Sequence, residues 1–319
     1  MLTTIIVSLA FVTAPIEPAV SVTKFKTFSN IKATAIATSP QGTLFAVASE
    51  DRQVRIIDSK TMQTKFQLTG HPMTVYGLAF SPDGKFLLSG DESARIWVWN
   101  TANGQKVREF PRDKGHTRGI QSFAFARNGK SFASVGKDDV IKVWGFAGGH
   151  PTHTIAGSGA NFYGAAFLPS GGLATGTLKE GLRVYSPTFS LAATMKLGGG
   201  QGANDIAVSP TGNLGLTAGR DGNVTVWDIA KREKLASMLG HSDWVLGVAV
   251  APNGRLAASS STDTKVVVWD IKAYKRVATI TDRAFVDSLV AFTNDGKYLL
   301  TTDAGNALQV FQVSPPAKK

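Results

Sequence analysis

Short apolar runs alternate with polar turns along almost the whole chain after residue 20. Between Val75 and Trp99, three such runs are separated by two turns, the first of which is Ser81-Pro82-Asp83-Gly84. A proline early in a turn and a glycine at its end supply the backbone angles that a tight reversal needs. Runs of this length with turns at regular spacing are typical of antiparallel strands, and no segment shows a sustained helical period. A fourth strand is predicted at residues 105–110, so one unit holds four strands.

This unit repeats about every 42 residues. Two markers follow the same period: a bulky apolar residue that ends the third strand, and a glycine in the first turn. The apolar markers are Ile57, Trp99, Trp144, Tyr185, Trp227, Trp269 and Phe311. The glycine markers are Gly42, Gly84, Gly129, Gly171, Gly212, Gly254 and Gly296. Repetition of a β unit at this period predicts an all-β fold, a seven-bladed β-propeller of four-stranded antiparallel blades.

The two ends of the chain indicate how the ring closes. The seventh unit ends at Val313, directly after its third strand, so its outer strand is missing. Residues 20–28 resemble the outer strands of other units, such as residues 64–68 and 276–280. We expect this N-terminal strand to complete the last blade, which removes the open gap in the ring. The prediction is one propeller domain over residues 20–313, followed by a short basic tail at residues 314–319.

The repeat resembles the WD-repeat family over nearly the whole chain after residue 20. The family motif places a Gly-His pair before the first strand, a Ser or Thr on the second strand, an Asp in the next turn and a Trp at the end of the third strand. Two units carry all of these residues, and in each the Asp follows the His by 22 positions. They are Gly115-His116, Ser134, Asp138 and Trp144, and Gly240-His241, Ser259, Asp263 and Trp269.

The other units depart from this motif. The second unit has Ser93 at the Asp position, and the fifth has Gly199 at the His position. Their retained members are His71, Ser89 and Trp99 in the second unit, and Thr217, Asp221 and Trp227 in the fifth. The first unit keeps Asp51 and Asp58, while the fourth and seventh are expected to keep only the turn and the strand hydrophobics.

The resemblance implies that the motif residues form a buried hydrogen-bond network in each complete blade. Such a network is tolerated inside a sheet only when its members satisfy one another. We therefore expect the blades that lack it to depend on packing and to open first.

Composition favours one globular domain with a basic surface. Apolar residues make up 43% of the chain and charged residues 18%, and no linker divides it. The absence of cysteine excludes disulfides, thiolate metal sites and a cysteine nucleophile. The net charge of +11 favours anionic partners, but Lys and Arg are scattered over all units without interleaved aromatics. A solvated surface is therefore favoured over a nucleic-acid groove, which stays open as an alternative.

The first residues have features of a secretory signal. Residues 2–14 are apolar with small residues, and Val12-Thr13-Ala14 would serve as a cleavage site, which predicts an exported or periplasmic protein. No Lys or Arg precedes the apolar run, and Pro15 is unfavourable after a cleavage site. The alternative is an uncleaved segment flanking the propeller of a cytoplasmic protein. The run is too short to span a bilayer, so no membrane span is predicted.

Candidate catalytic groups are few. His71, His116 and His241 occupy the structural position of the motif, which leaves His150 and His153. Pro151 excludes a helix that would align these two side chains, and no third ligand is near, so a plain loop between the third and fourth strands is expected. The run from Gly198 to Gly202 lacks the Lys-Ser/Thr of a phosphate loop and is interpreted as a connector. We predict no catalytic residue, no cofactor and no metal.

What remains is the surface. The resemblance implies that partners dock on the face where the first strands begin, around the mouth of the central channel. One position per unit, five residues after the His position, forms the expected ring: Thr34, Tyr76, Gln121, Tyr163, Asn204, Leu246 and Ser288. Trp244 lies two positions before Leu246, and Lys137 and Arg220 directly precede the Asp position.

Large aromatics with nearby positive charge are typical of binding hot spots. The predicted function is a monomeric, non-enzymatic scaffold that binds a protein or peptide through Tyr76, Tyr163, Trp244, Lys137 and Arg220. The alternatives are that Trp244 merely covers its neighbouring blade, that the charge binds nucleic acid, or that the channel holds an enzyme site or a small ligand.

Overall fold

The computed structural model describes residues 20–314 except residues 158, 199–200, 282–288, 304 and 306. This part of the chain forms strands and turns and contains no α-helix. The candidate signal, within residues 1–19, and residues 315–319 of the basic tail lie outside the described residues. The secretory signal therefore stays a prediction, which N-terminal sequencing of the mature protein tests.

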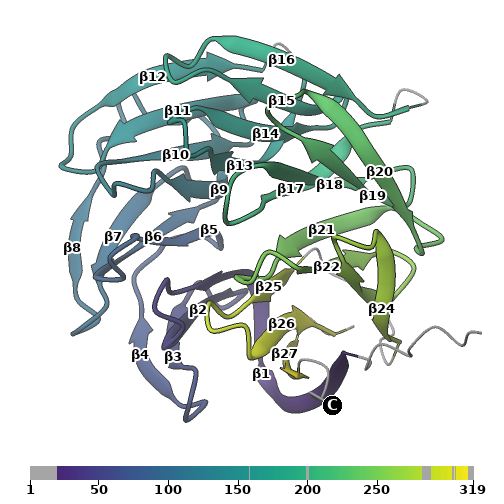
Figure 1. Ribbon diagram of the computed structural model, residues 1–319. Helices are drawn as coiled ribbons and strands as arrows, with labels where there is room; N and C mark the ends of the chain where they lie inside the picture. Colours follow the sequence, from purple (N-terminus) through teal and green to yellow (C-terminus); the bar gives the residue numbers. More distant parts are fainter. Residues whose placement is uncertain are drawn as a thin grey trace, which may run out of the picture.

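The strands form seven blades arranged around a central axis (Figure 1). Blades 1 and 7 share the long strand β1 (Ser21–Thr38). Blade 1 is completed by β2 (Leu44–Ser49), β3 (Val54–Asp58) and β4 (Thr64–Leu68). Blade 2 contains β5 (Val75–Phe80), β6 (Phe86–Asp91), β7 (Ile96–Asn100) and β8 (Lys106–Glu109). Blade 3 contains β9 (Ile120–Phe125), β10 (Ser131–Gly136), β11 (Val140–Gly145) and β12 (Pro151–Ala156).

The remaining blades follow the same antiparallel order. Blade 4 contains β13 (Phe162–Phe167), β14 (Leu173–Thr177), β15 (Gly181–Tyr185) and β16 (Leu191–Lys196). Blade 5 contains β17 (Ala203–Val208), β18 (Leu214–Gly219), β19 (Asn223–Asp228) and β20 (Glu233–Leu239). Blade 6 contains β21 (Val245–Val250), β22 (Leu256–Ser261), β23 (Val266–Asp270) and β24 (Lys275–Ile280). Blade 7 contains β25 (Val290–Phe292), β26 (Tyr298–Thr302) and β27 (Ala307–Ser314). The prediction of seven blades is confirmed.

The turn between the first and second strands shows why its glycine recurs. In blade 2, the Gly84 amide donates to the carbonyl of Ser81 at 2.8 Å, and the Ser81 amide donates to the carbonyl of Phe86 at 2.8 Å. Gly84 has a φ of +71°, a left-handed conformation that costs glycine little and other residues more. The other six marker glycines also have positive φ, so the turn repeats with the blade.

The core lies between the blades. In the described residues, seven apolar clusters each bridge two neighbouring blades. Between blades 5 and 6, for example, Val224 and Val226 pack with Trp269 and Val248. Each blade therefore buries both faces of its sheet against neighbours, as sheet packing requires.

Strand β1 closes the ring. Its first part is the outer strand of blade 7 and pairs with β27 from Ser21 opposite Ser314 to Phe28 opposite Leu308. Its second part becomes the inner strand of blade 1 and pairs with β2. The expected closure by the N-terminal strand is confirmed, and the two ends of the described chain are joined by a hydrogen-bonded ladder.

Substitution of Val22 tests how much this ladder stabilises the ring. Val22 is partly buried and packs against the cluster between blades 6 and 7, so Val22→Asp places a charge on that cluster. We expect the free energy of unfolding to fall by about 2 kcal/mol, measured by urea unfolding. Thr23→Asp, on the exposed side of the same strand, is the control and should change it little. Equal losses in both variants would contradict the role of Val22.

Candidate functional site

The motif residues of blades 3 and 6 meet in buried networks. In blade 3, His116 Nδ1 lies 2.9 Å from Asp138 Oδ1, and its Nε2 lies 2.7 Å from Ser134 Oγ. Trp144 Nε1 donates to the same serine oxygen at 2.8 Å. In blade 6, the contacts from His241 to Asp263, from His241 to Ser259 and from Trp269 to Ser259 are 3.0, 2.8 and 2.8 Å. One serine oxygen thus joins the turn to the third strand.

Charge stabilises these networks as well. Burial alone would raise the pKa of Asp138, but its hydrogen bond and charge interaction with His116 outweigh burial and hold the pKa below the usual value. A carboxyl with a lowered pKa stabilises the fold above its unfolded pKa of about 3.9, and this contribution is lost as the pH falls.

Blade 2 also has a complete network, so the expectation that Ser93 replaces its acid is wrong. His71 Nδ1 lies 2.9 Å from Asp91 Oδ2, and its Nε2 lies 2.6 Å from Ser89 Oγ. Trp99 Nε1 donates to Ser89 Oγ at 2.7 Å. Asp91 is the fully buried last residue of β6, and the Ser93 amide and hydroxyl donate to its other oxygen. The acid is supplied from two residues earlier because the side chain reaches the histidine from the strand end.

The fourth and seventh blades keep more than the turn and the strand hydrophobics, which corrects that expectation. Thr175 and Thr301 occupy the Ser/Thr position and are fully buried. Their hydroxyls donate to carbonyls in or next to the first strand, Gly164 at 2.6 Å and Leu289 at 2.9 Å. A hydroxyl at this position therefore finds a backbone acceptor where no histidine is available.

The other incomplete blades use further arrangements. In blade 5, Trp227 Nε1 donates to Thr217 Oγ1 at 2.9 Å, while Asp221 accepts from the Asn223 amide at 3.1 Å. Gly199, at the His position of this blade, lies outside the described residues. In blade 1, Asp51 accepts from Ser49 and pairs with Arg55.

His150 lies in the loop between the third and fourth strands of blade 3, as expected, whereas His153 lies on the fourth strand itself, contrary to expectation. Pro151 to Ala156 form β12, and His153 pairs opposite Val143 of β11. His150 Nδ1 lies 3.6 Å from Asp113 Oδ1. Within the described ranges, no three His, Asp or Glu side chains are grouped closely enough to hold a metal ion.

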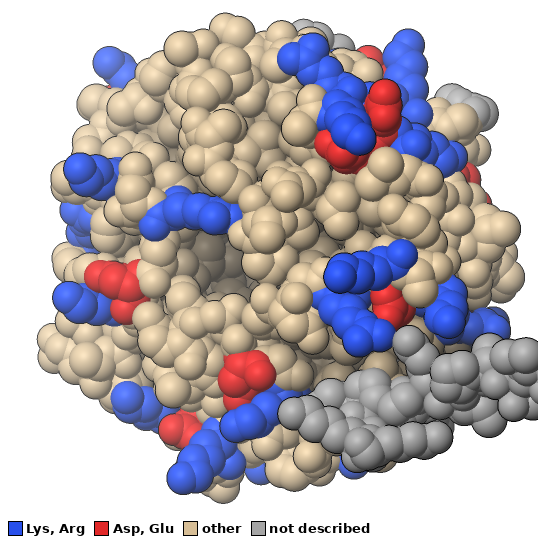
Figure 2. Space-filling model, in the orientation of Figure 1, with Lys and Arg blue, Asp and Glu red and all other residues tan. Residues whose placement is uncertain are grey.

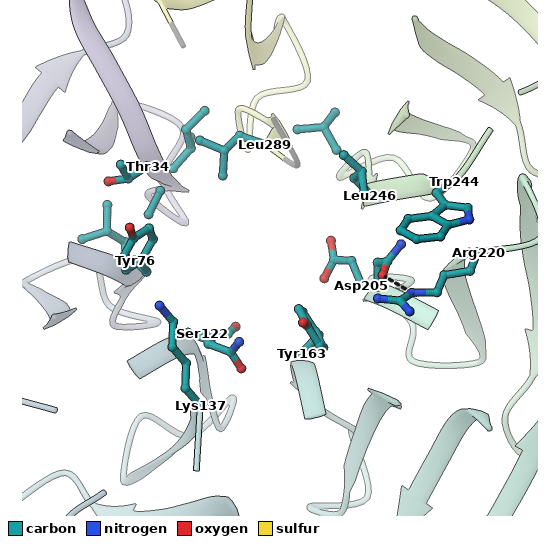
Figure 3. A pocket seen from close by; sticks show the side chains of 16 residues that line it. Thr34, Tyr76, Ser122, Lys137, Tyr163, Asp205, Arg220, Trp244, Leu246 and Leu289 are labelled. Atoms are coloured by element: carbon teal, nitrogen blue, oxygen red, sulfur yellow. Dashed lines mark hydrogen bonds between the residues drawn. The ribbon is translucent and has the colours of Figure 1, made fainter. Parts of the chain in front are cut away.

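A cavity of about 600 Å³ lies on the axis of the ring, where the first strands begin. Figure 3 shows side chains that converge on it from around the ring. Every predicted partner-binding residue lines it: Tyr76, Gln121, Tyr163, Asn204, Trp244, Leu246, Lys137 and Arg220, and so does Thr34. Ser288, the seventh member of the expected ring, lies outside the described residues, and its neighbour Leu289 lines the cavity. The equivalent positions converge because each blade repeats the same path from the axis outwards.

Two cations at the mouth rest on aromatic rings of neighbouring blades. Lys137 Nζ lies 4.6 Å from the ring centre of Tyr76 and 2.9 Å from Glu92 Oε1. The Arg220 guanidinium lies 4.7 Å from the ring centre of Trp244 (Figure 3). Both distances are in the range of cation–π contacts. Trp244 therefore does contact the neighbouring blade, as the alternative supposed, yet 46% of its surface remains exposed.

The polar residues around the channel mouth differ in whether their side chains form hydrogen bonds. Asn204 donates to the carbonyl of Val245 at 2.8 Å and accepts from Arg220 Nε at 3.0 Å, so it joins blade 5 to blade 6. Gln121 differs, because its buried Oε1 has no hydrogen-bond partner among the described residues. Tyr163 keeps 37% of its surface exposed.

Asp205 lines the same cavity and was not predicted. It follows Asn204 in β17, at a position where most other first strands have a small residue: Ala35, Gly77, Ser122, Gly164, Gly247 and, as the larger exception, Leu289. Asp205 Oδ1 accepts from the Ile206 amide at 2.8 Å, and Oδ2 accepts from the Val248 amide of blade 6 at 3.1 Å. A Cβ at Gly164 would come within 2.7 Å of Asp205 Oδ1, so a glycine is needed beside it.

The carboxyl of Asp205 is unusually easy to protonate. Burial raises its pKa to about 7, against the opposing effect of the Val248 and Ile206 amides. No described Lys, Arg or His lies within 4.0 Å of it to form an ion pair. The sequence does contain a signal for Asp205. It is the one acidic residue at the position that directly follows the ring residue in each unit.

On the face drawn in Figure 2, the charged side chains are spread out. Figure 2 shows one face with a hollow at its centre and with Lys and Arg distributed around its rim instead of in one basic patch. Across the described parts of the chain, no helix combines the length and apolar character needed to cross a bilayer.

Comparison with known proteins agrees with the geometry. The family model described as "WD domain, G-beta repeat" matches residues 21–58, 62–100, 104–145, 193–228 and 232–270, which is more than half of the chain. The matched segments leave out residues 146–192 and 271–314, which hold most of blades 4 and 7, where the motif histidine and aspartate are absent.

Individual relatives are similar over part of their length. The nuclear distribution protein PAC1 of Arthroderma otae is 27% identical over 57% of this chain and 42% of its own. An uncharacterized WD repeat-containing protein of Synechocystis sp. is 28% identical over 49% of this chain and 43% of its own. The U3 small nucleolar RNA-associated protein 15 of Saccharomyces cerevisiae is 27% identical over 60% of this chain and 37% of its own. The aligned part of this chain thus spans less than half the length of these relatives.

Removing the Asp91 carboxyl should destabilise the protein more than removing the Ser93 hydroxyl. Asp91→Ala leaves a buried nitrogen of His71 without its partner, a loss of about 2–3 kcal/mol, whereas Ser93→Ala removes a hydrogen bond worth about 1 kcal/mol. Urea unfolding of both variants measures the difference. A larger loss of stability in Ser93→Ala than in Asp91→Ala would contradict the assignment of Asp91 as the partner of His71.

Asp205 should make stability fall as the pH rises towards neutrality. Between about pH 4 and pH 7, the folded protein keeps a proton that the unfolded chain has released, so the free energy of unfolding decreases by about 1.4 kcal/mol for each unit of pKa difference. Asp205→Asn removes this loss, so its stability relative to the wild type should increase from pH 4 to pH 8 in urea unfolding. The control is Glu233→Gln, on an exposed outer strand. A difference that does not change with pH would contradict the titration of Asp205 in this window.

Proposed function

Because the chain belongs to the WD-repeat family, we propose that it is a non-enzymatic scaffold that binds a protein or peptide at the mouth of its central channel. The observation that carries this proposal is the group of aromatic side chains around one axial cavity. Tyr76, Tyr163 and Trp244 all line it, and the last two keep more than a third of their surface exposed. Large aromatic groups that remain accessible beside a cavity are the residue types that anchor interfaces.

The mouth is also preorganised for binding. Lys137 and Arg220 rest on Tyr76 and Trp244, and each pair joins two blades. The blades are themselves fixed by the closed ring. Side chains that are already ordered lose little entropy when a partner binds, so more of the contact energy contributes to affinity.

The lining residues support binding better than catalysis. Those that the structure describes supply one carboxylate, Asp205, and no histidine. General acid–base chemistry commonly needs two such groups with separate tasks around a reacting atom. The net charge of +11 is distributed over the surface, so a nucleic acid would be held by long-range attraction without a defined groove.

Affinity capture from a lysate of the source cells tests the proposed face. We expect the Tyr76→Ala, Trp244→Ala double variant to lose partners that the wild type retains, because both aromatic anchors are removed. The matched control is the Leu191→Ala, Tyr274→Ala double variant, whose side chains are 54% and 42% exposed and lie away from the cavity.

Two outcomes would overturn the proposal. Equal capture by the mouth variant, the control and the wild type would show that another face binds. Loss of all retained partners between low and moderate salt, together with nucleic acid in the captured material, would instead support association through charge.

A further inference from the structure

We infer that the channel mouth admits a lysine or arginine side chain of the partner, and that the charged end of this side chain pairs with the carboxylate of Asp205. The inference rests on the proposed function, since it specifies which chemical group of a partner enters the cavity. It does not follow from the aromatic rim, which would equally suit an apolar side chain.

The position of Asp205 is the first argument. In Figure 3 its carboxyl group points from β17 towards the centre of the ring, inside the rim formed by Tyr76, Lys137 and Trp244. Among the described residues that line the cavity, it is the only acidic one. A group that enters along the axis therefore meets one carboxyl group, which becomes fully charged above neutral pH.

The unused hydrogen-bonding capacity of the wall is the second argument. Each carboxylate oxygen of Asp205 accepts from one backbone amide, and each has room for a further donor. An ammonium or guanidinium group carries three or five donors and no acceptor, so it complements the Asp205 carboxylate.

The cost of partly burying an unpaired carboxylate is the third argument. Asp205 is half-buried, no described cation lies within 4.0 Å of it, and a partly buried charge without a counter-ion is unfavourable. A bound cation would supply that counter-ion and favour the ionised form. Binding should therefore release a proton near neutral pH, because the pKa of the free carboxyl is raised to about 7.

The cations of the mouth do not make it an anion site. Lys137 is paired with Glu92 at 2.9 Å, and Arg220 is held by Asn204 and Trp244. An anion that entered the cavity would be repelled by the Asp205 carboxylate. An anion bound outside the rim would make no use of the cavity. In the described part of the lining, the other titratable or charged side chains are Tyr76, Lys137, Tyr163 and Arg220.

The overall charge predicts a second signature. A net charge of +11 repels a cationic partner at long range, while Asp205 attracts it only at short range. Salt screens the long-range repulsion more effectively than a contact inside a cavity. Binding of a cationic side chain should therefore not decline steeply with salt.

The test uses the full-length chain and four capped tripeptides of the form acetyl-Gly-X-Gly-amide, in which X is lysine, arginine, norleucine or glutamate. Binding is followed by NMR chemical shifts at pH 6, 7 and 8. We expect the lysine or arginine peptide to bind, with an affinity that rises roughly tenfold from pH 6 to pH 8 as Asp205 ionises. The norleucine and glutamate peptides should bind at least roughly tenfold more weakly at pH 8.

Variants assign the effect to one carboxylate. Asp205→Asn should lower the affinity for the cationic peptide by roughly tenfold or more at pH 8 and remove its pH dependence. Asp205→Ser replaces this variant if Asp205→Asn does not fold. Glu233→Gln, on the exposed outer strand β20, should behave as the wild type. The pH profile of the wild type itself requires no variant.

Three results would overturn the inference: equal binding of the norleucine peptide, tighter binding of the glutamate peptide at low pH, or unchanged binding of the cationic peptides by Asp205→Asn. Failure of all four peptides, together with partner loss in the Tyr76→Ala, Trp244→Ala variant, would reject the cationic group and leave the proposed docking face intact. A third combination is that the lysine or arginine peptide binds while the Tyr76→Ala, Trp244→Ala variant captures the same partners as the wild type. That result would support the cation site in the cavity and reject the proposed docking face.

Discussion

Every blade of this protein is a sheet with two apolar faces, and neither face is stable in water unless another sheet covers it. The seven clusters between neighbouring blades meet this requirement, and they can do so for all blades only if the ring is closed. Closure depends on β1, which belongs to blade 7 in its first part and to blade 1 in its second. The pairing of β1 with β27 is thus the contact on which the burial of all the others depends.

The same geometry determines where a ligand can be recognised. Because the blades start at the axis, one repeated position from the first strand of each of blades 1 to 6 reaches the channel mouth. Backbone amides and carbonyls are largely used within the sheets, so recognition falls to the side chains at these positions. Differences between blades, such as Tyr76, Gln121 and Asp205, therefore give the mouth its chemistry without altering the frame that holds them.

The hydrogen-bond networks show that the fold requires satisfied polar groups more than particular residues. Blade 2 takes its acid from Asp91 at the end of a strand, and blades 4 and 7 direct a threonine hydroxyl to a backbone carbonyl. Each solution leaves the buried hydroxyl with a partner, which is the physical condition for placing it there. Departure from the family motif is therefore not the same as loss of the interaction.

The sequence by itself determined the number of blades, the four-stranded unit and the exchange of the first strand, because each is carried by periodic spacing that local turns and apolar runs enforce. It also located the ring of residues from Thr34 to Leu246, since equivalent positions in a closed repeat must converge. Only the tertiary structure decided that Asp91 pairs with His71, that Arg220 covers Trp244, and that Asp205 is half-buried with no counter-ion among the described residues. These outcomes depend on distances between residues of different strands or blades, and on whether solvent reaches them, which spacing along one chain does not encode.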